Sequence, residues 1–167
     1  MRTKNFSKEC FYNALVELMK EKDFDSIQIN EICEKAGFNR STFYRNYDSK
    51  MDILMVKFKE EAKIYQEFVD SSLDKSFIYK VTKLFELLRS SYDIVMQFRK
   101  AKLDYEMYQV FSSIYPTDKS LNIPYEMTYK IGGVYMVIMK WMEDGMVEKE
   151  EEMAKRLKDI INYSMEM

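Results

Sequence analysis

Residues 29–47 read INEICEKAGFNRSTFYRNY, and this stretch decides the fold. In its first half, apolar residues recur at the spacing of one helix face, which predicts a short helix over 28–36. Gly37 follows as the residue that ends this helix, because glycine adopts left-handed backbone angles without a Cβ clash. Asn39 can then cap a second short helix over 40–47. Two short helices joined by a glycine-containing turn form a helix-turn-helix unit.

The sequence on both sides of this unit is helical as well. Residues 7–21 carry an apolar stripe that predicts a first helix. Residues 49–52, SKMD, have the pattern of a capping box, which predicts that a longer helix begins there. Phe43 and Tyr47 fall on one face of the 40–47 helix, so we expect both side chains in a buried core.

The rest of the chain also has helical periodicity. The segment 92–115 is rich in tyrosine, phenylalanine and methionine and forms one helix or two, and Pro116 ends it. The clearest loop is 116–124, which holds both prolines. The helix that begins at 49–52 is expected to run to about residue 70, and further helices are predicted at about residues 75–90, 125–144 and 148–164.

These patterns predict an all-α protein of about nine helices. Only 4 glycines and 2 prolines occur in 167 residues, few for the tight turns of a sheet protein. We expect an N-terminal three-helix head that contains the helix-turn-helix, over residues 1–48. We expect a C-terminal helical bundle over residues 49–167.

The composition excludes several kinds of chemistry. The chain contains no histidine, so it has neither a Ser-His or Cys-His catalytic pair nor a histidine-ligated metal site. The two cysteines, Cys10 and Cys33, cannot form a structural zinc site by themselves. We therefore expect no metal, no cofactor and no enzymatic activity. Both cysteines lie on apolar helix faces and are expected to be buried, reduced thiols.

Charge and hydropathy leave the partner open. The net charge is −2, so total charge does not predict nucleic-acid binding. Residues 1–50 hold nine Lys or Arg and eight Asp or Glu, a net charge of +1, and residues 51–167 have a net charge of −3. No stretch approaches the roughly 18 apolar residues of a membrane helix, and the start of the chain has no apolar signal core. We expect a cytoplasmic protein without a membrane partner.

Residues 26–54 resemble the TetR family of regulators. The resemblance rests on the quoted string 29–47, followed by Ser49-Lys50 and Ile53-Leu54. The family pairs an I-A-x-x-A-G-V second helix with a T-F-Y-x-H-F-x-S-K-x-x-L segment. Three positions depart from the family pattern and affect the expected specificity: Gln28 replaces a usual Ser or Thr, Asn46 a frequent His, and Tyr47 a frequent Phe.

The resemblance implies how this head contacts double-stranded DNA. A recognition helix enters the major groove with its N-terminal residues toward the base edges, here Asn39, Arg40 and Ser41. Arg40 suits a bidentate contact to guanine. The resemblance implies phosphate contacts for Thr42, Tyr44 and Lys50, a base or phosphate contact for Arg45, and a weaker contact of either kind for Asn30. By their residue types alone, the basic residues would be ordinary solvated charges.

The C-terminal part resembles a domain of shorter family members through the pattern G-x-x-x-x-x-x-x-W-x-x-x-G-M around Trp141. In the family, the last two helices of two subunits form a four-helix interface. The resemblance therefore implies a homodimer and makes 49–167 a dimerisation domain with possible effector binding. The alternative is that these residues form the core of a single chain. The expected interface residues are Ile131, Val134, Ile138, Trp141, Leu157 and Ile161.

A small-molecule effector is a further implication of the resemblance, since family members commonly hold one in an apolar pocket of the body. Methionine and aromatic side chains suit such a pocket. The same residues also suit an ordinary core, and the body is short for this family. The candidate pocket residues are Met96, Tyr105, Tyr108 and Phe111.

The sequence thus predicts a sequence-specific DNA-binding transcription regulator, in this family most often a repressor that an effector releases. An activator or coactivator on the same fold, acting through a protein partner, is the alternative. A helical enzyme would need a carboxylate pair, lysine or tyrosine site, and no such cluster has convincing spacing. A structural adaptor would not depend on Arg40 and Tyr44 for DNA binding.

Overall fold

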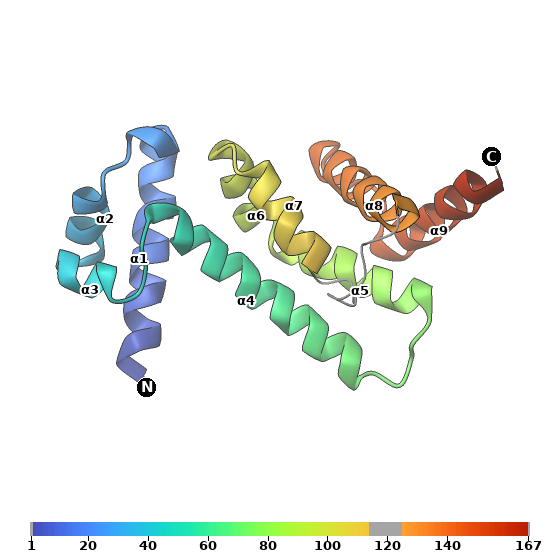
Figure 1. The fold of residues 1–167 in the computed structure, drawn as a ribbon, viewed down its shortest axis with the longest axis horizontal. Helices are drawn as coiled ribbons and strands as arrows, with labels where there is room; N and C mark the ends of the chain where they lie inside the picture. Colours follow the sequence, from blue (N-terminus) through green and yellow to red (C-terminus); the bar gives the residue numbers. More distant parts are fainter. Residues whose placement is uncertain (1, 114–124, 167) are drawn as a thin grey trace. The chain divides into compact units, whose positions relative to one another are not determined.

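The computed structural model describes residues 2–113 and 125–166, and the described residues are helical, without a strand (Figure 1). The all-α prediction is therefore confirmed. The predicted loop over 116–124, including Pro116, lies outside the described residues. The described residues form the 3-10 helix η1 (Phe24–Ser26) and the α-helices α1 (Arg2–Glu21), α2 (Ile29–Ala36), α3 (Arg40–Tyr44), α4 (Lys50–Ser71), α5 (Phe77–Ser90), α6 (Tyr92–Lys100), α7 (Asp104–Ser113), α8 (Tyr125–Glu143) and α9 (Glu150–Glu166).

The chain divides into two compact units. The first unit holds the chain up to Glu60 together with Asp93–Met107, and the second holds Glu61–Tyr92 and the chain from Tyr108 onward. Helices α4 and α7 each contribute residues to both units. The helix-turn-helix lies in the first unit.

The core of the first unit is built around an aromatic cluster between α1 and α3. The Phe11 ring of α1 lies 5.4 Å from the Phe43 ring, edge to face, and 6.1 Å from the Tyr47 ring. Phe11 and Phe43 are completely buried, and Tyr47 is almost so. Burial of one such aromatic side chain is worth about 2–3 kcal/mol, so a five-residue helix is held in place by packing. The predicted core positions of Phe43 and Tyr47 are confirmed.

The turn between α2 and α3 has the predicted local structure. Gly37 adopts φ 72°, and the Phe38 N–H donates to the Cys33 carbonyl at 3.0 Å, which satisfies the end of α2. The Asn39 side chain accepts from the Thr42 N–H at 2.9 Å and caps α3. Cys33 is buried as expected, and burial raises the pKa of its thiol, whereas Cys10 is only half-buried.

Some helix boundaries differ from the sequence prediction. Helix α3 ends at Tyr44 and not at 47, because the Asn46 and Tyr47 N–H groups both donate to the Phe43 carbonyl and tighten the chain into a turn. Helix α1 begins at Arg2, earlier than predicted. Within the predicted 92–115 segment, the described residues 92–113 form two helices, α6 and α7, and Lys102 adopts φ 56° between them.

In the second unit, α5 packs against the α8–α9 corner. The Phe85 ring lies 4.8 Å from the Trp141 ring, edge to face. The Arg89 guanidinium lies 5.0 Å from the centre of the Trp141 ring, donates to the carbonyls of Met146 and Glu148, and pairs with Glu150. One arginine thus satisfies carbonyls of the corner that joins α8 and α9, and it holds α9 close to α5.

Substitution of Gly37 tests the turn. Because its φ is positive, Gly37→Ala should lower the free energy of unfolding by about 1 kcal/mol through backbone strain. The matched control is Gly132→Ala, where an added Cβ meets nothing within 4 Å and the backbone is helical. There alanine should raise stability by about 0.5–1 kcal/mol. Urea unfolding measures both, and shifts of the same sign would contradict the turn geometry.

Candidate nucleic-acid interface

Five of the predicted DNA-contact residues lie together on the solvent side of α3 and its flanking turns. Because Phe43 points into the core, the rest of this short helix faces outward, and the Tyr44 side chain is 47% exposed. A half-exposed tyrosine beside two arginines offers donors and an aromatic edge to a groove or a phosphate. The exposed residues are Asn39, Arg40, Ser41, Tyr44 and Arg45.

Arg40 and Tyr44 form a local pair on this face. The Arg40 Nη2 donates to the Tyr44 hydroxyl at 3.1 Å, and the guanidinium carbon lies 5.6 Å from the centre of the Tyr44 ring. The Tyr44 ring itself packs edge to face on Phe43 at 5.3 Å. A guanidinium has five N–H donors, so this bond leaves most of them for a base or a phosphate. Tyr44 thus orients the Arg40 side chain, and both side chains remain exposed at the surface.

Asn39 has a structural role in addition to its predicted contact. Its Oδ1 accepts from the Ser41 hydroxyl at 2.8 Å and from the Thr42 hydroxyl at 3.0 Å, besides the capping bond. The half-buried Thr42 hydroxyl also accepts from the Arg45 Nη2 at 3.2 Å. A line of hydrogen bonds therefore joins the start of α3 to Arg45, and the Asn39 amide NH₂ is the group left to meet a base edge.

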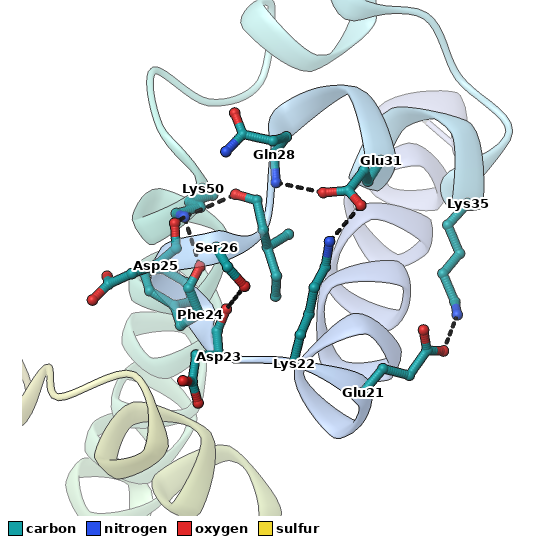
Figure 2. A network of polar contacts seen from close by, with 11 residues as sticks. Glu21, Lys22, Asp23, Phe24, Asp25, Ser26, Gln28, Glu31, Lys35 and Lys50 are labelled. Carbon is teal, nitrogen blue, oxygen red and sulfur yellow. Dashed lines mark hydrogen bonds and ion pairs between the residues drawn. The ribbon is translucent and has the colours of Figure 1, made fainter.

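Lys50 does not lie on the surface made by these residues. Its Nζ donates to the backbone carbonyls of Phe24 at 2.6 Å, Asp25 at 3.0 Å and Ile27 at 2.8 Å (Figure 2). An ammonium group has three N–H donors, and these three carbonyls use them all. Burial also lowers the pKa of the half-buried Lys50. In place of the predicted phosphate contact, Lys50 binds the chain's own backbone.

Asn30 is exposed in the first turn of α2. Figure 1 shows α2 and α3 side by side, so Asn30 belongs to the same head as the residues of α3. Of the predicted DNA-binding residues, the structure groups those from Asn39 to Arg45, places Asn30 on the neighbouring helix, and directs Lys50 inward.

Two ion pairs that the sequence did not reveal join α1 to α2 (Figure 2). Lys22 pairs with Glu31, and Lys35 pairs with Glu21 at 3.0 Å. Glu31 also accepts from the Gln28 N–H at 2.8 Å, so its carboxylate caps α2 as well. Both contacts lower the pKa of Glu31, the Lys22 hydrogen bond most of all. Pairs separated by nine and fourteen residues leave no periodic signal in a sequence.

The residues predicted for the dimer contact lie mostly in the chain's own core. Five of the six are buried within a single chain, and only Ile161 is half-buried. A side chain that is already buried in its own chain has little surface left for a partner, so the predicted interface stays a prediction for these residues. The five core residues are Ile131, Val134, Ile138, Trp141 and Leu157.

The four candidate pocket residues are not gathered in one unit. Met96 and Tyr105 belong to the first unit, and Tyr105 is exposed. Tyr108 and Phe111 belong to the second, where their rings pack on the Tyr135 ring at 5.3 and 5.5 Å. Tyr108 and Phe111 are therefore part of the aromatic packing of the second unit.

Over the described ranges 2–113 and 125–166, no three Cys, Asp or Glu side chains gather in a way that could hold a metal ion. None of the helices in those ranges is long and apolar enough to cross a membrane.

Comparisons with known proteins agree with this geometry. Residues 11–55 match the family described as bacterial regulatory proteins, tetR family. The fold is similar to that of a TetR transcriptional regulator from Streptococcus agalactiae 2603V, at 18% identity and a TM-score of 0.60 over 96% of both chains. It is also similar to the fatty acid degradation regulator FadR from Bacillus halodurans, at 16% identity and a TM-score of 0.59 over 93% of this chain and 94% of that one.

A third similar structure is the transcriptional regulator FadR from Bacillus subtilis in complex with stearoyl-CoA. Its identity is 17% and its TM-score 0.56, over 92% of this chain and 96% of that one. No curated protein sequence matches the chain.

The fold is similar to that of TetR transcriptional regulators, and the head is a helix-turn-helix whose second helix is exposed, the arrangement that such units use to contact DNA. Residues 11–55 of the head match the tetR family of bacterial regulatory proteins, and the likeness of the whole chain to TetR regulators is one of fold.

The capping role of Asn39 can be separated from its DNA contact. Asn39→Ala should lower the free energy of unfolding by about 1 kcal/mol, because the Thr42 N–H loses its acceptor. Asn39→Ser keeps a capping oxygen and should stay within a few tenths of a kcal/mol of the parent. Urea unfolding of both variants is the measurement. Equal losses for serine and alanine would show that the side chain does not act as a cap.

Proposed function

We propose that this protein is a homodimeric repressor that binds a DNA operator through α3 and is released by a small-molecule effector. The observation that carries the proposal is the exposed pair of Arg40 and Tyr44 on a helix whose opposite side is anchored by the buried Phe43. The division of labour that we propose follows the chain: residues 1–48 bind DNA, and residues 49–167 dimerise and respond to the effector.

In this proposal Arg40 contacts a guanine and the Asn39 amide and Ser41 hydroxyl reach neighbouring base edges. Tyr44 and Thr42 contact phosphates, which set the register without reading sequence. Arg45 contacts a base or a phosphate, and Asn30 adds a weaker contact from α2. Lys50 is left out of the contact set, because its three donors are occupied by backbone carbonyls.

Dimerisation follows from operator geometry, because two heads must read half-sites about 34–36 Å apart or a multiple of that distance. We propose that the partner subunit covers an exposed stripe of residues along α8, together with the adjoining Ile160 of α9. Met136 is 63% exposed and lines a hollow of about 350 Å³ together with Ile160 of α9. The stripe repeats at helical spacing and consists of Tyr125, Tyr129, Gly133, Met136 and Lys140.

Large exposed apolar side chains in one row favour a protein partner over solvent. The stripe replaces the buried residues predicted from the sequence, and Ile161 of α9 remains a half-buried candidate. A second copy is the occupant that operator symmetry requires.

Effector release would be a shift between conformations that fit and do not fit the operator. The FadR structure from Bacillus subtilis holds stearoyl-CoA, which supports the idea that proteins of this fold accommodate an effector. For this chain, Tyr108 and Phe111 of the second unit remain the proposed effector contacts, with no effector chemistry assigned.

Substitution of Arg40 tests the operator contact. Arg40→Ala should weaken operator binding by about 1–3 kcal/mol, because a bidentate base contact is lost. Lys20→Ala is the control: Lys20 is exposed on α1 and pairs with Glu17, outside the proposed contact set. Footprinting on promoter fragments near the protein's own gene, with purified protein, provides the measurement.

Two results would contradict this proposal. One is purified protein that protects none of the fragments, which would favour a coactivator that acts through a protein partner. The other is Arg40→Ala with parental affinity. The affinity of the parent should also fall with salt, with a log–log slope of about −0.9 for each neutralised phosphate.

The dimer face has its own test. Met136→Glu places a charge in the proposed interface and should shift the protein toward monomer, because a buried unpaired carboxylate is costly. Val147→Glu is the matched control, since Val147 is an exposed apolar residue that does not lie on α8 or α9. Sedimentation velocity separates the species. A Met136→Glu protein as dimeric as the control would place the interface elsewhere.

A further inference from the structure

The Lys50 ammonium occupies a site built from backbone carbonyls. Its three hydrogen bonds reach the oxygens of Phe24, Asp25 and Ile27 at 2.6–3.0 Å, and its Nζ lies 4.7 Å from the centre of the Phe24 ring (Figure 2). Carbonyls at the end of a helical turn carry partial negative charge and favour a cation. The hydrogen-bonding capacity of the Lys50 ammonium is therefore satisfied by the chain itself, without a phosphate or another external anion.

The segment that Lys50 binds is itself well fixed. The Phe24 and Ile27 side chains are buried, so the 3-10 helix η1 is anchored by its side chains on one side and by Lys50 through its carbonyls. Burial lowers the pKa of Lys50, and the charge of Lys22 lowers it further. The negative charges of Asp25 and Glu31 act in the opposite direction. A charged side chain that remains half-buried under these conditions is held by its hydrogen bonds.

The carbonyls held by Lys50 lead directly into α2. Ile27 precedes Gln28, the N-cap of α2, whose N–H donates to Glu31. Glu31 in turn pairs with Lys22 at the end of α1. A shift of Ile27 would therefore disturb the start of α2, and α3 follows α2 after one short turn.

At its other end, Lys50 is the first residue of a rigidly capped helix. The Asp52 carboxylate accepts from the Ser49 N–H at 2.7 Å and from the Asp48 N–H at 3.0 Å. The predicted capping box thus exists, and it fixes the backbone from which Lys50 extends. Lys50 consequently links two rigid points, the start of α4 and the start of α2.

We propose that Lys50 is a positioning residue that locks the helix-turn-helix to the start of α4, so that α3 reads DNA at a set angle. Lys50 does so without contacting DNA. The proposal rests on the proposed DNA-binding function, and it assigns to α4 a direct mechanical connection to the reading head.

Arginine separates this role from a phosphate contact. Lys50→Arg keeps the positive charge, so it would preserve a phosphate contact. A planar guanidinium cannot direct three donors from one point, so it should not fit a site of three carbonyls. Lys50→Met keeps a similar length and apolar stem but removes the donors and the charge.

The experiment measures hydrogen exchange and DNA affinity for Lys50→Arg and Lys50→Met under conditions where each variant is folded. We expect amide protection over 27–32 to fall by about tenfold or more in both, because buried carbonyls lose their donors. Operator affinity should fall by about tenfold or more in both, with the salt slope unchanged. Ala14→Gly on α1 is the structural control: it destabilises the helix yet should keep parental affinity when folded.

A phosphate contact would give a different pattern and would overturn the proposal. Lys50→Arg would then keep its affinity, and Lys50→Met would lose about 0.9 of salt slope without loss of amide protection. If Lys50→Met does not fold, the parent protein still tests the site: the Lys50 ammonium protons should exchange slowly enough to give a nitrogen-15 correlated signal, unlike those of the exposed Lys59.

The two proposals fail in distinguishable ways. A parent protein that binds no operator removes the proposed function, yet the exchange data on Lys50 still stand. Parental amide protection in both Lys50 variants removes the positioning role, even if the protein binds its operator.

Discussion

The packing of Phe43 against Phe11 is the interaction on which the rest of the head depends. Helix α3 is too short to be stable by itself, and its orientation is set by this one completely buried ring. Because Phe43 faces α1, Arg40 and Tyr44 face solvent. The side chains that α3 exposes to solvent are therefore determined by the burial of Phe43 on the opposite side of the same helix.

Polar contacts then connect the helices that surround this small aromatic core. Two lysines connect the helices of the head to one another. Lys22 pairs with Glu31, the carboxylate that caps α2, and Lys50 at the start of α4 donates to backbone carbonyls before α2. Neither interaction adds much to the surface charge available to a polyanion. In a chain of net charge −2, the positive charge exposed on the proposed DNA-contacting face is therefore local to Arg40 and Arg45.

The second unit is held together by a different set of contacts, which centre on Trp141. Trp141 contacts both Phe85 and Arg89 of α5, and the same arginine donates to carbonyls of the α8–α9 corner. Helix α8 carries apolar residues on nearly all sides, so its inner face forms the core while Tyr129 and Met136 remain outside. A helix of this kind is stable in a single chain and still offers a surface to a partner.

The sequence by itself determined the helices of the head, the turn at Gly37 and the caps at Asn39 and Ser49–Asp52. Each of these depends on residues within about four positions of one another, where spacing dictates contact. Tertiary structure alone decided that Lys50 faces carbonyls more than twenty residues earlier and that Trp141 and its neighbours on α8 are core. Periodicity cannot distinguish a face buried in the same chain from one buried against a partner, because both are apolar, and it cannot reveal a donor whose acceptors are backbone atoms, since every residue has a carbonyl.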